Sequence, residues 1–130
     1  MIQEVKTSNA PRAIGSYSQA IRSGDLLFIS GQIPLTPNGE LKTGSIQDEI
    51  KQCFDNIKAI AESCGANLNQ TVKYTVYLTN LGFFADVNQV SLSYFNEPFP
   101  ARATVQISAL PRDARVEIDA IVRINQSGTL

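Results

Sequence analysis

Two charged residues in the last third of the chain are the first candidates for chemistry. Arg102 and Glu117 both lie in the segment FPARATVQISALPRDARVEIDA, which spans residues 99–120. A planar guanidinium suits bidentate binding of a carboxylate. Glu117 could hold Arg102 in place or position a water molecule, but a carboxylate beside an arginine is a weak base unless it is also desolvated. The alternative is a cross-strand salt bridge that contributes about 0.2–1 kcal/mol.

The composition excludes several kinds of catalysis. The 130 residues include no histidine, so Ser–His triads, Cys–His dyads and histidine zinc sites are excluded. Proton transfer is left to carboxylates, tyrosine, lysine, cysteine or ordered water. Cys53 and Cys64 lie on one predicted helix, roughly 16 Å apart along its axis, which is too far for a disulfide. Two cysteines are also too few ligands for a structural zinc site without help from histidine.

Length and charge indicate one globular domain over residues 1–130. Hydrophobic residues make up 43% of the chain and charged residues 18%, with a net charge of −1. This balance gives no sign of a basic nucleic-acid surface, and the longest apolar run, at 26–29, is too short to span a bilayer. The N-terminal segment lacks the apolar core of a signal peptide. We therefore expect a cytoplasmic protein without nucleic-acid or membrane partners.

The clearest predicted element is a helix over residues 45–64. Ser45 is a good N-cap, and Asp48 places a carboxylate in the first turn. Gly65 is expected just after the last turn. The helix carries one apolar stripe, made of Ile46, Ile50, Cys53, Phe54, Ile57, Ile60 and Ala61.

Alternating and turn-forming residues predict the other elements. We expect strands at 17–21, 26–30, 72–78, about 102–107 and 116–124, a turn at 23–25, and a loop at 30–40 with a tight turn at Asn38–Gly39. A second helix is expected at about 81–95, capped by Asn80, with Phe84 facing the core and with Pro98 and Pro100 ending it. The order β-β-α-β-α-β-β predicts an α+β domain, a mixed sheet with two helices on one face.

Alternation in the last two strands predicts a sheet face that the helices leave bare. The small and apolar side of each strand is expected under the helices. The bare face would carry Arg102, Thr104, Gln106, Glu117, Asp119 and Ile121. Two explanations stay open, a partner subunit that covers this face and an ordinary solvated antiparallel sheet.

Three further residues are weaker candidates. Gly31, in the segment SGQ, would let the backbone approach a ligand closely, or it simply forms a turn. Tyr17 could form the wall of a pocket or belong to the core. Asn88 is a polar residue in an otherwise apolar helical stripe, which a specific contact or a position at the helix edge would explain equally well.

Together these stretches resemble a known family. The segments NAPRAIGSYSQAI, FISGQIP, YLTNLGFFADVNQV and FPARATVQISALPRDARVEIDAIV are similar, in order and over nearly the whole chain, to the Rid (reactive intermediate deaminase, YjgF) proteins. The resemblance implies a chorismate-mutase-like fold and a homotrimer with three sites between subunits. It also implies hydrolysis of 2-aminoacrylate, 2-iminopropanoate and 2-iminobutanoate to 2-keto acids and ammonia. Neither a metal nor an organic cofactor is expected from the resemblance.

The resemblance also assigns roles to single residues. Arg102 falls on the family's arginine, which binds the substrate carboxylate, and Glu117 on its glutamate, implicated in activating water. The residues that fall on pocket-lining positions are Tyr17, Gly31, Phe84 and Asn88. Two positions depart from the family, since Thr104 stands where many members have cysteine and Ser16 where many have proline. A hydroxyl at position 104 can still donate a hydrogen bond to substrate.

Two other functions stay open at this stage. The same cleft could bind small carboxylates in a regulatory protein without turnover. RNA cleavage by a translation inhibitor is the third candidate, against which the acidic balance of the chain argues.

Overall fold

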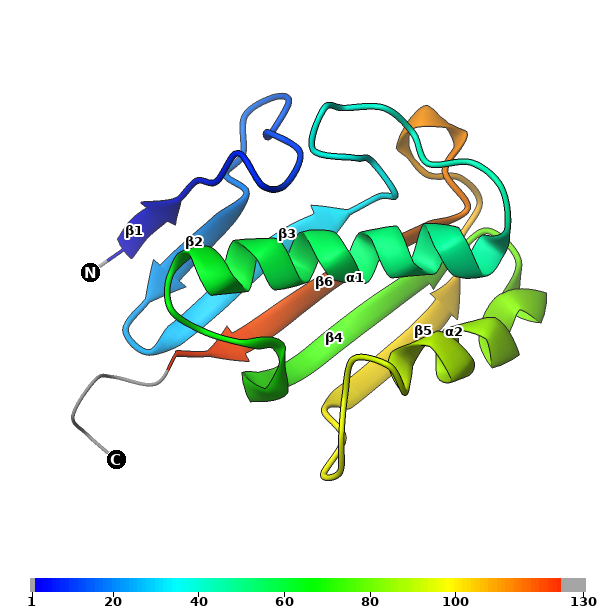
Figure 1. Cartoon of the computed structure of the whole chain (residues 1–130). Helices are drawn as coiled ribbons and strands as arrows, with labels where there is room; N and C mark the ends of the chain where they lie inside the picture. Colours follow the sequence, from blue (N-terminus) through cyan, green and yellow to red (C-terminus); the bar gives the residue numbers. More distant parts are fainter. Residues whose placement is uncertain (1, 125–130) are drawn as a thin grey trace.

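A single six-stranded sheet forms the backbone of the structure, a computed structural model that describes residues 2–124. Neighbouring strands are antiparallel except for the parallel pair β4 and β5 (Figure 1). In sheet order the strands are β1 (Ile2–Val5), β2 (Ala20–Ser23), β3 (Leu26–Gln32), β6 (Val116–Arg123), β4 (Thr71–Leu78) and β5 (Ala101–Gln106). The α+β class and the mixed sheet are as predicted.

Helix α1 (Ile46–Ser63) lies across the middle of the sheet. Ser45 accepts a hydrogen bond from the backbone N–H of Asp48 at 3.0 Å, and Gly65 adopts a left-handed backbone after the C-cap residue Cys64. Both ends are therefore as the sequence predicts. Cys53 is fully buried, and neither cysteine forms a disulfide. The predicted stripe faces the sheet because its residues recur every three to four positions.

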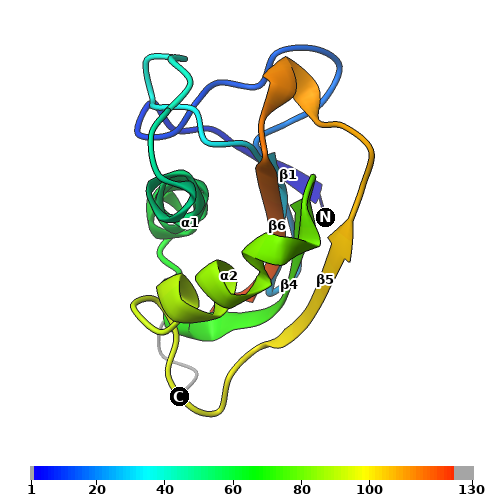
Figure 2. The ribbon, with the colours of Figure 1, turned by 90° about the vertical axis from the view of Figure 1, so that its right-hand side faces the viewer.

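The hydrophobic core lies between α1 and one face of the sheet. Both helices cover this same face and leave the other uncovered (Figure 2). The core contains the helix residues Ile50, Phe54, Ile57 and Ile60, and the strand residues Leu27, Ile29, Tyr74, Val76, Leu78, Val116, Ile118, Ala120 and Val122. Below, the two sides of the sheet are called the helix face and the open face.

The second helix is shorter than predicted. Asn80 caps a single 3₁₀ turn at Leu81–Phe83, and α2 (Phe84–Ser91) follows directly. After Ser91 the chain continues only in turns, with the N–H of Phe95 bonded to the Ser91 carbonyl at 3.0 Å. Phe84 does not face the core as predicted but is 41% exposed, because its ring lies against the guanidinium of Arg102 on the edge strand β5.

The N-terminal region also differs from prediction. β1 was not expected, because only Val5 of its four residues is buried. β2 begins at Ala20, and Tyr17 lies before it in a bend with half of its surface exposed. β3 runs to Gln32, beyond the predicted end. The tight turn at Asn38–Gly39 is confirmed, with the Gly39 N–H bonded to the Thr36 carbonyl at 2.8 Å.

The side chains of the edge strand β5 lie on the opposite faces of the sheet from those predicted. β5 pairs with β4 so that Arg102 lies beside Tyr74 and Thr104 beside Val76. Tyr74 and Val76 belong to the core, so Arg102, Thr104 and Gln106 lie on the helix face, while Ala103 and Val105 lie on the open face. Glu117, Asp119 and Ile121 are on the open face as predicted. Alternation shows which residues of one strand share a side, but only the pairing with β4 fixes which side that is.

Candidate functional site

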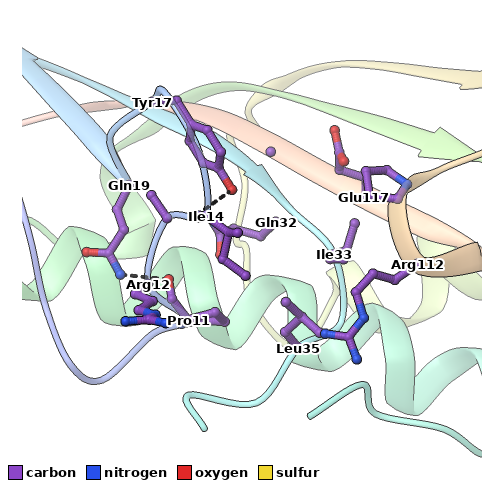
Figure 3. A pocket seen from close by; sticks show the side chains of 13 residues that line it. Pro11, Arg12, Ile14, Tyr17, Gln19, Gln32, Ile33, Leu35, Arg112 and Glu117 are labelled. Atoms are coloured by element: carbon purple, nitrogen blue, oxygen red, sulfur yellow. Dashed lines mark hydrogen bonds between the residues drawn. The ribbon is translucent and has the colours of Figure 1, made fainter. Parts of the chain in front are cut away.

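A cavity of about 310 Å³ opens beside the end of β3 on the open face. Three predicted site residues line it, namely Tyr17, Gly31 and Glu117 (Figure 3). The rest of its wall comes from the loop before β2, the loop after β3 and the loop before β6, with Pro11, Arg12, Ala13, Ile14, Gln19, Gln32, Ile33, Leu35, Pro111 and Arg112. Most of this lining is apolar, so a carboxyl group in it is partly removed from water.

Glu117 is the acidic group of this cavity. Its side chain is half-buried, and no residue among 2–124 donates a hydrogen bond to it. Burial, followed by the nearby charge of Asp119, raises the pKa of Glu117 above its usual value. Asp119 itself accepts a hydrogen bond from the Tyr77 hydroxyl at 3.1 Å. A carboxyl whose pKa is raised in this way is a better proton acceptor than an exposed glutamate.

Gly31 lets the Glu117 carboxylate lie directly against the backbone of β3. The strand contains a β-bulge, since Ile29 pairs with Ala120 and Gln32 with Ile118, which leaves one extra residue on β3. A Cβ at Gly31 would lie 2.7 Å from the Glu117 Cδ, far inside contact distance. Only glycine therefore permits this arrangement, and a bulge beside a site is a common way to redirect a strand.

Tyr17 reaches the same cavity from an irregular loop. Its hydroxyl accepts a hydrogen bond from the backbone N–H of Ile14 at 3.3 Å (Figure 3). Because this loop belongs to no helix or strand, its shape depends on side-chain contacts, chiefly those of the buried Gln19.

A second cavity, of about 820 Å³, lies on the helix face between α2 and β5. Arg102 and Asn88 line it, together with apolar residues that include Leu92, Phe95 and Phe99. The Arg102 guanidinium lies 5.2 Å from the centre of the Phe84 ring, at cation–π distance. No carboxylate among residues 2–124 forms an ion pair with Arg102. The guanidinium is thus held by an aromatic ring and keeps its hydrogen-bond donors available for an anion.

Thr104 follows Arg102 on the same side of β5. Its hydroxyl oxygen is buried and has no hydrogen-bond partner among the described residues. A buried hydroxyl without a hydrogen-bond partner lowers the stability of the folded state, so this threonine is not explained by packing of the fold alone.

The structure therefore separates the predicted site residues into two groups. Tyr17, Gly31 and Glu117 meet in the open-face cavity, whereas Phe84, Asn88, Arg102 and Thr104 gather around α2 and β5. The predicted contact between Arg102 and Glu117 within one chain is wrong, because their side chains lie on opposite faces.

Sequence reasoning missed three residues that shape the open-face cavity. Gln19 and Ser30 bind the backbone of the loop that carries Tyr17, and Arg112 lies on the rim, where its Nη1 donates to the Gly39 carbonyl. Ser30 and Gln19 both lie within segments that carry the family resemblance, which was the available signal.

An ion-pair cluster supports the start of β6. Arg115 donates to the buried carboxylate of Glu49 on α1 and to the Gly44 carbonyl, and its guanidinium stacks on Phe83. The hydrogen bond to Glu49 raises the pKa of Arg115. These contacts fix the strand two residues before Glu117. Between residues 2 and 124 no three His, Cys, Asp or Glu side chains cluster as metal ligands would, and no helix there is long and apolar enough to cross a membrane.

Comparison with known proteins decides the family. Residues 7–124 match the family described as Endoribonuclease L-PSP, which includes the Rid and YjgF proteins. The chain belongs to this Rid family. The match covers both cavities and every strand except β1.

Several Rid relatives are similar over almost their whole length. The chain is 48% identical over 125 residues to a RutC family protein of Sinorhizobium fredii, covering 95% of this chain and 99% of the relative. It is 43% identical to a 2-iminobutanoate/2-iminopropanoate deaminase of Dermatophagoides farinae, covering 92% and 94%. The crystal structure of RidA from a Psychrobacter species matches with a TM-score of 0.90 and 46% identity, covering 94% and 99%. The Rid fold implied by the sequence is therefore confirmed.

Proposed function

We propose that this Rid protein hydrolyses reactive 2-imino acids and their enamine tautomers, such as 2-iminopropanoate and 2-iminobutanoate, to 2-keto acids and ammonia. The observation that carries the proposal is Arg102. A guanidinium that is held on the Phe84 ring and has no acidic partner among residues 2–124 is suited to bind the carboxylate of a small acid. The deaminase name of the Dermatophagoides relative supports the same reading.

Glu117 is the group that we assign to the attacking water. The iminium carbon is already electrophilic, so the reaction needs a positioned water and a proton acceptor rather than a metal. As the water oxygen bonds to this carbon, Glu117 accepts one of the water's protons. It then returns the proton to the nitrogen, the C–N bond breaks, ammonia leaves, and loss of the remaining hydroxyl proton forms the keto group. The raised pKa of Glu117 suits both proton transfers.

The opposite placement of Arg102 and Glu117 supports a site shared between two copies of the chain. In one copy the carboxylate-binding group and the water-activating group line different cavities. A second copy that brings its α2–β5 edge to the open-face cavity of the first would complete the site. We propose a homotrimer with three such sites, in which Tyr17, Gly31, Phe84, Asn88 and Thr104 line the pocket.

Trapping of the imine tests this function. A threonine dehydratase generates 2-iminobutanoate, semicarbazide traps it, and the purified protein competes with the trap. We expect wild type and Arg22→Ala, which removes a half-buried arginine of β2 that lines neither cavity, to suppress the semicarbazone. Arg102→Ala should lose about 1.5–3 kcal/mol of transition-state binding, roughly 10- to 150-fold in kcat/KM. Equal trapping with and without wild type, or full activity of Arg102→Ala, would exclude the mechanism.

RNA cleavage is a second candidate because the family description names an endoribonuclease. The net charge of −1 opposes it, since RNA binding depends largely on positive charge. Incubation of labelled RNA with the same wild-type and Glu117→Gln samples decides between the two. Cleavage by wild type alone would support the nuclease. Saturable keto-acid binding without any imine turnover would instead indicate a regulatory binding protein.

A further inference from the structure

Gln19 holds together the loop that carries Tyr17. Gln19 is only 4% exposed, and within residues 2–124 all the hydrogen bonds of its side chain join it to the backbone of residues 7–11. Its Oε1 accepts from the Thr7 N–H at 2.8 Å. Its Nε2 lies 2.8 Å from the Pro11 carbonyl oxygen, 3.0 Å from that of Thr7 and 3.4 Å from that of Ala10. One amide group thus replaces the regular hydrogen bonds that this segment lacks.

A second tie connects the same loop to the β-bulge of β3. The Ser30 hydroxyl donates to the Ser18 carbonyl at 2.6 Å, and the Ser30 N–H donates to the Gln19 carbonyl at 3.0 Å. Ser30 precedes Gly31, which makes room for Glu117. The loop is therefore anchored at the point of the strand that also admits the Glu117 carboxylate.

We infer that Gln19 is a positioning residue that acts through Tyr17 and keeps it beside Glu117 in the open-face cavity. The inference rests on the proposed function for its catalytic consequence, but the anchoring itself does not. The loop contributes Pro11, Arg12, Ala13, Ile14 and Tyr17 to the cavity, so its release would remove about a third of the lining residues. Gln19 lies next to Pro11, and its Nε2 donates a hydrogen bond to the Pro11 carbonyl (Figure 3).

Two substitutions separate anchoring from general stability. Gln19→Met preserves the size of the side chain and removes every amide contact. Ser30→Ala keeps Gln19 and removes only the hydroxyl tie, which gives a milder variant if Gln19→Met folds poorly. Gln52→Met is the matched control, because within residues 2–124 the side chain of Gln52 on α1 bonds only to Asn56, and Gln52 lines neither cavity.

Limited proteolysis provides a measurement that does not depend on activity. Arg12 is exposed within the anchored loop, so trypsin cleavage after Arg12, identified by fragment mass, reports release of the loop. We expect Gln19→Met to accelerate this cleavage at least tenfold and Ser30→Ala to accelerate it less, with Gln52→Met at the wild-type rate. Cleavage after Arg12 at the wild-type rate in both loop variants would overturn the anchoring.

Kinetics then test the route through Tyr17. Gln19→Met should lower kcat/KM roughly ten- to hundredfold, because small displacements of a site residue cost this much. In a Tyr17→Ala background the same substitution should cost less than about twofold, since the group it positions is gone. An equal loss in both backgrounds would overturn the positioning role. If wild type is inactive but Gln19→Met still accelerates cleavage after Arg12, the proposed function is rejected. The inference that Gln19 anchors the loop is then still supported.

Discussion

Arg102 and Glu117 lie on opposite faces of the same sheet, with β4 between their strands. Arg102 offers a cation suited to binding a carboxylate, and Glu117 offers a half-buried carboxyl group suited to accepting a proton. Their separation within one chain makes the proposed shared site testable without a structure of the assembly.

Mixed assemblies should be more active than either parent variant. Arg102→Ala is expected to lose roughly 10- to 150-fold in kcat/KM, and Glu117→Gln is expected to lose at least as much. After the two are unfolded together and refolded at equal amounts, about a quarter of the sites should combine an intact Arg102 from one copy with an intact Glu117 from the other. The semicarbazide assay measures this recovery. Simple mixing of the folded variants is the control, and no recovery after refolding would place the two groups in separate functions.

Gly31→Ala should reduce activity more than stability. The added Cβ would collide with the Glu117 carboxyl group, which can swing away at little cost to folding but then leaves its place. We expect a loss of roughly tenfold or more in kcat/KM and a change below about 1 kcal/mol in the free energy of unfolding.

Gly65→Ala is the control for Gly31→Ala, because it should reduce stability without reducing activity. Gly65 has a φ of +82° and open space around its Cβ position. Alanine there should cost about 1 kcal/mol in urea unfolding because of the left-handed backbone, and leave kcat/KM unchanged. If both variants lost stability and activity in parallel, the special role of Gly31 would be rejected.

The pH dependence of activity should reflect the raised pKa of Glu117. As a base, Glu117 works only when ionised, so kcat/KM should rise with pH through an apparent pKa above the ordinary value of 4.5. Asp119→Asn removes a neighbouring negative charge and should shift this limb to lower pH. The measurement is a pH–rate profile with the imine-generating enzyme in excess at every pH. A limb at or below 4.5, or one that Asp119→Asn leaves unmoved, would contradict the assignment.

The raised pKa of Glu117 should also make the free energy of unfolding depend on pH. The folded protein binds the Glu117 proton more tightly than the unfolded chain does, so protonation of Glu117 stabilises the folded state. This stabilisation is fully present below the pKa of Glu117 in the unfolded chain, and it is lost as the pH rises through the pKa in the folded protein. Urea unfolding across this range should show a smaller decline for Glu117→Gln than for wild type. An identical decline would mean that other groups cause it.

Thr104→Val should stabilise the protein and weaken substrate binding. The buried hydroxyl has no partner among residues 2–124, so its removal should raise the free energy of unfolding by about 1 kcal/mol. Thr71→Val removes another buried hydroxyl without a partner among these residues, at the start of β4 rather than two positions from Arg102 on β5; neither threonine lines the two cavities. Both variants should be more stable, but only Thr104→Val should raise KM. An unchanged KM would remove Thr104 from the substrate-binding residues.

Much of the fold follows from local patterns in the sequence. The helix from Ile46 to Ser63 has a cap, an apolar stripe and a terminal glycine that all agree, and the structure reproduces each of them. The last strand alternates strictly, and its buried side is as predicted. Such elements are predictable because residues close in sequence determine them.

The placement of the site could not be predicted in the same way. The side on which Arg102 lies depends on how β5 pairs with β4, a contact that local alternation does not encode. β1 has one buried residue and too weak a pattern to recognise. The sequence predicts a strand from Tyr17, whereas β2 begins at Ala20, because the buried amide of Gln19 binds the backbone of the preceding loop.

The β-bulge of β3 interrupts the pairing with β6, and the same bulge positions residues of the open-face cavity. Deletion of Ser30 would let Ile29, Gly31 and Gln32 pair without interruption against β6, and the sheet itself would gain a continuous ladder. The same deletion would remove the hydroxyl that binds the Tyr17 loop and move the glycine that admits Glu117. For the proposed site, the more regularly paired strand is therefore expected to be the less active one. A search for stabilised variants that rewards regular pairing alone should then select against the proposed activity.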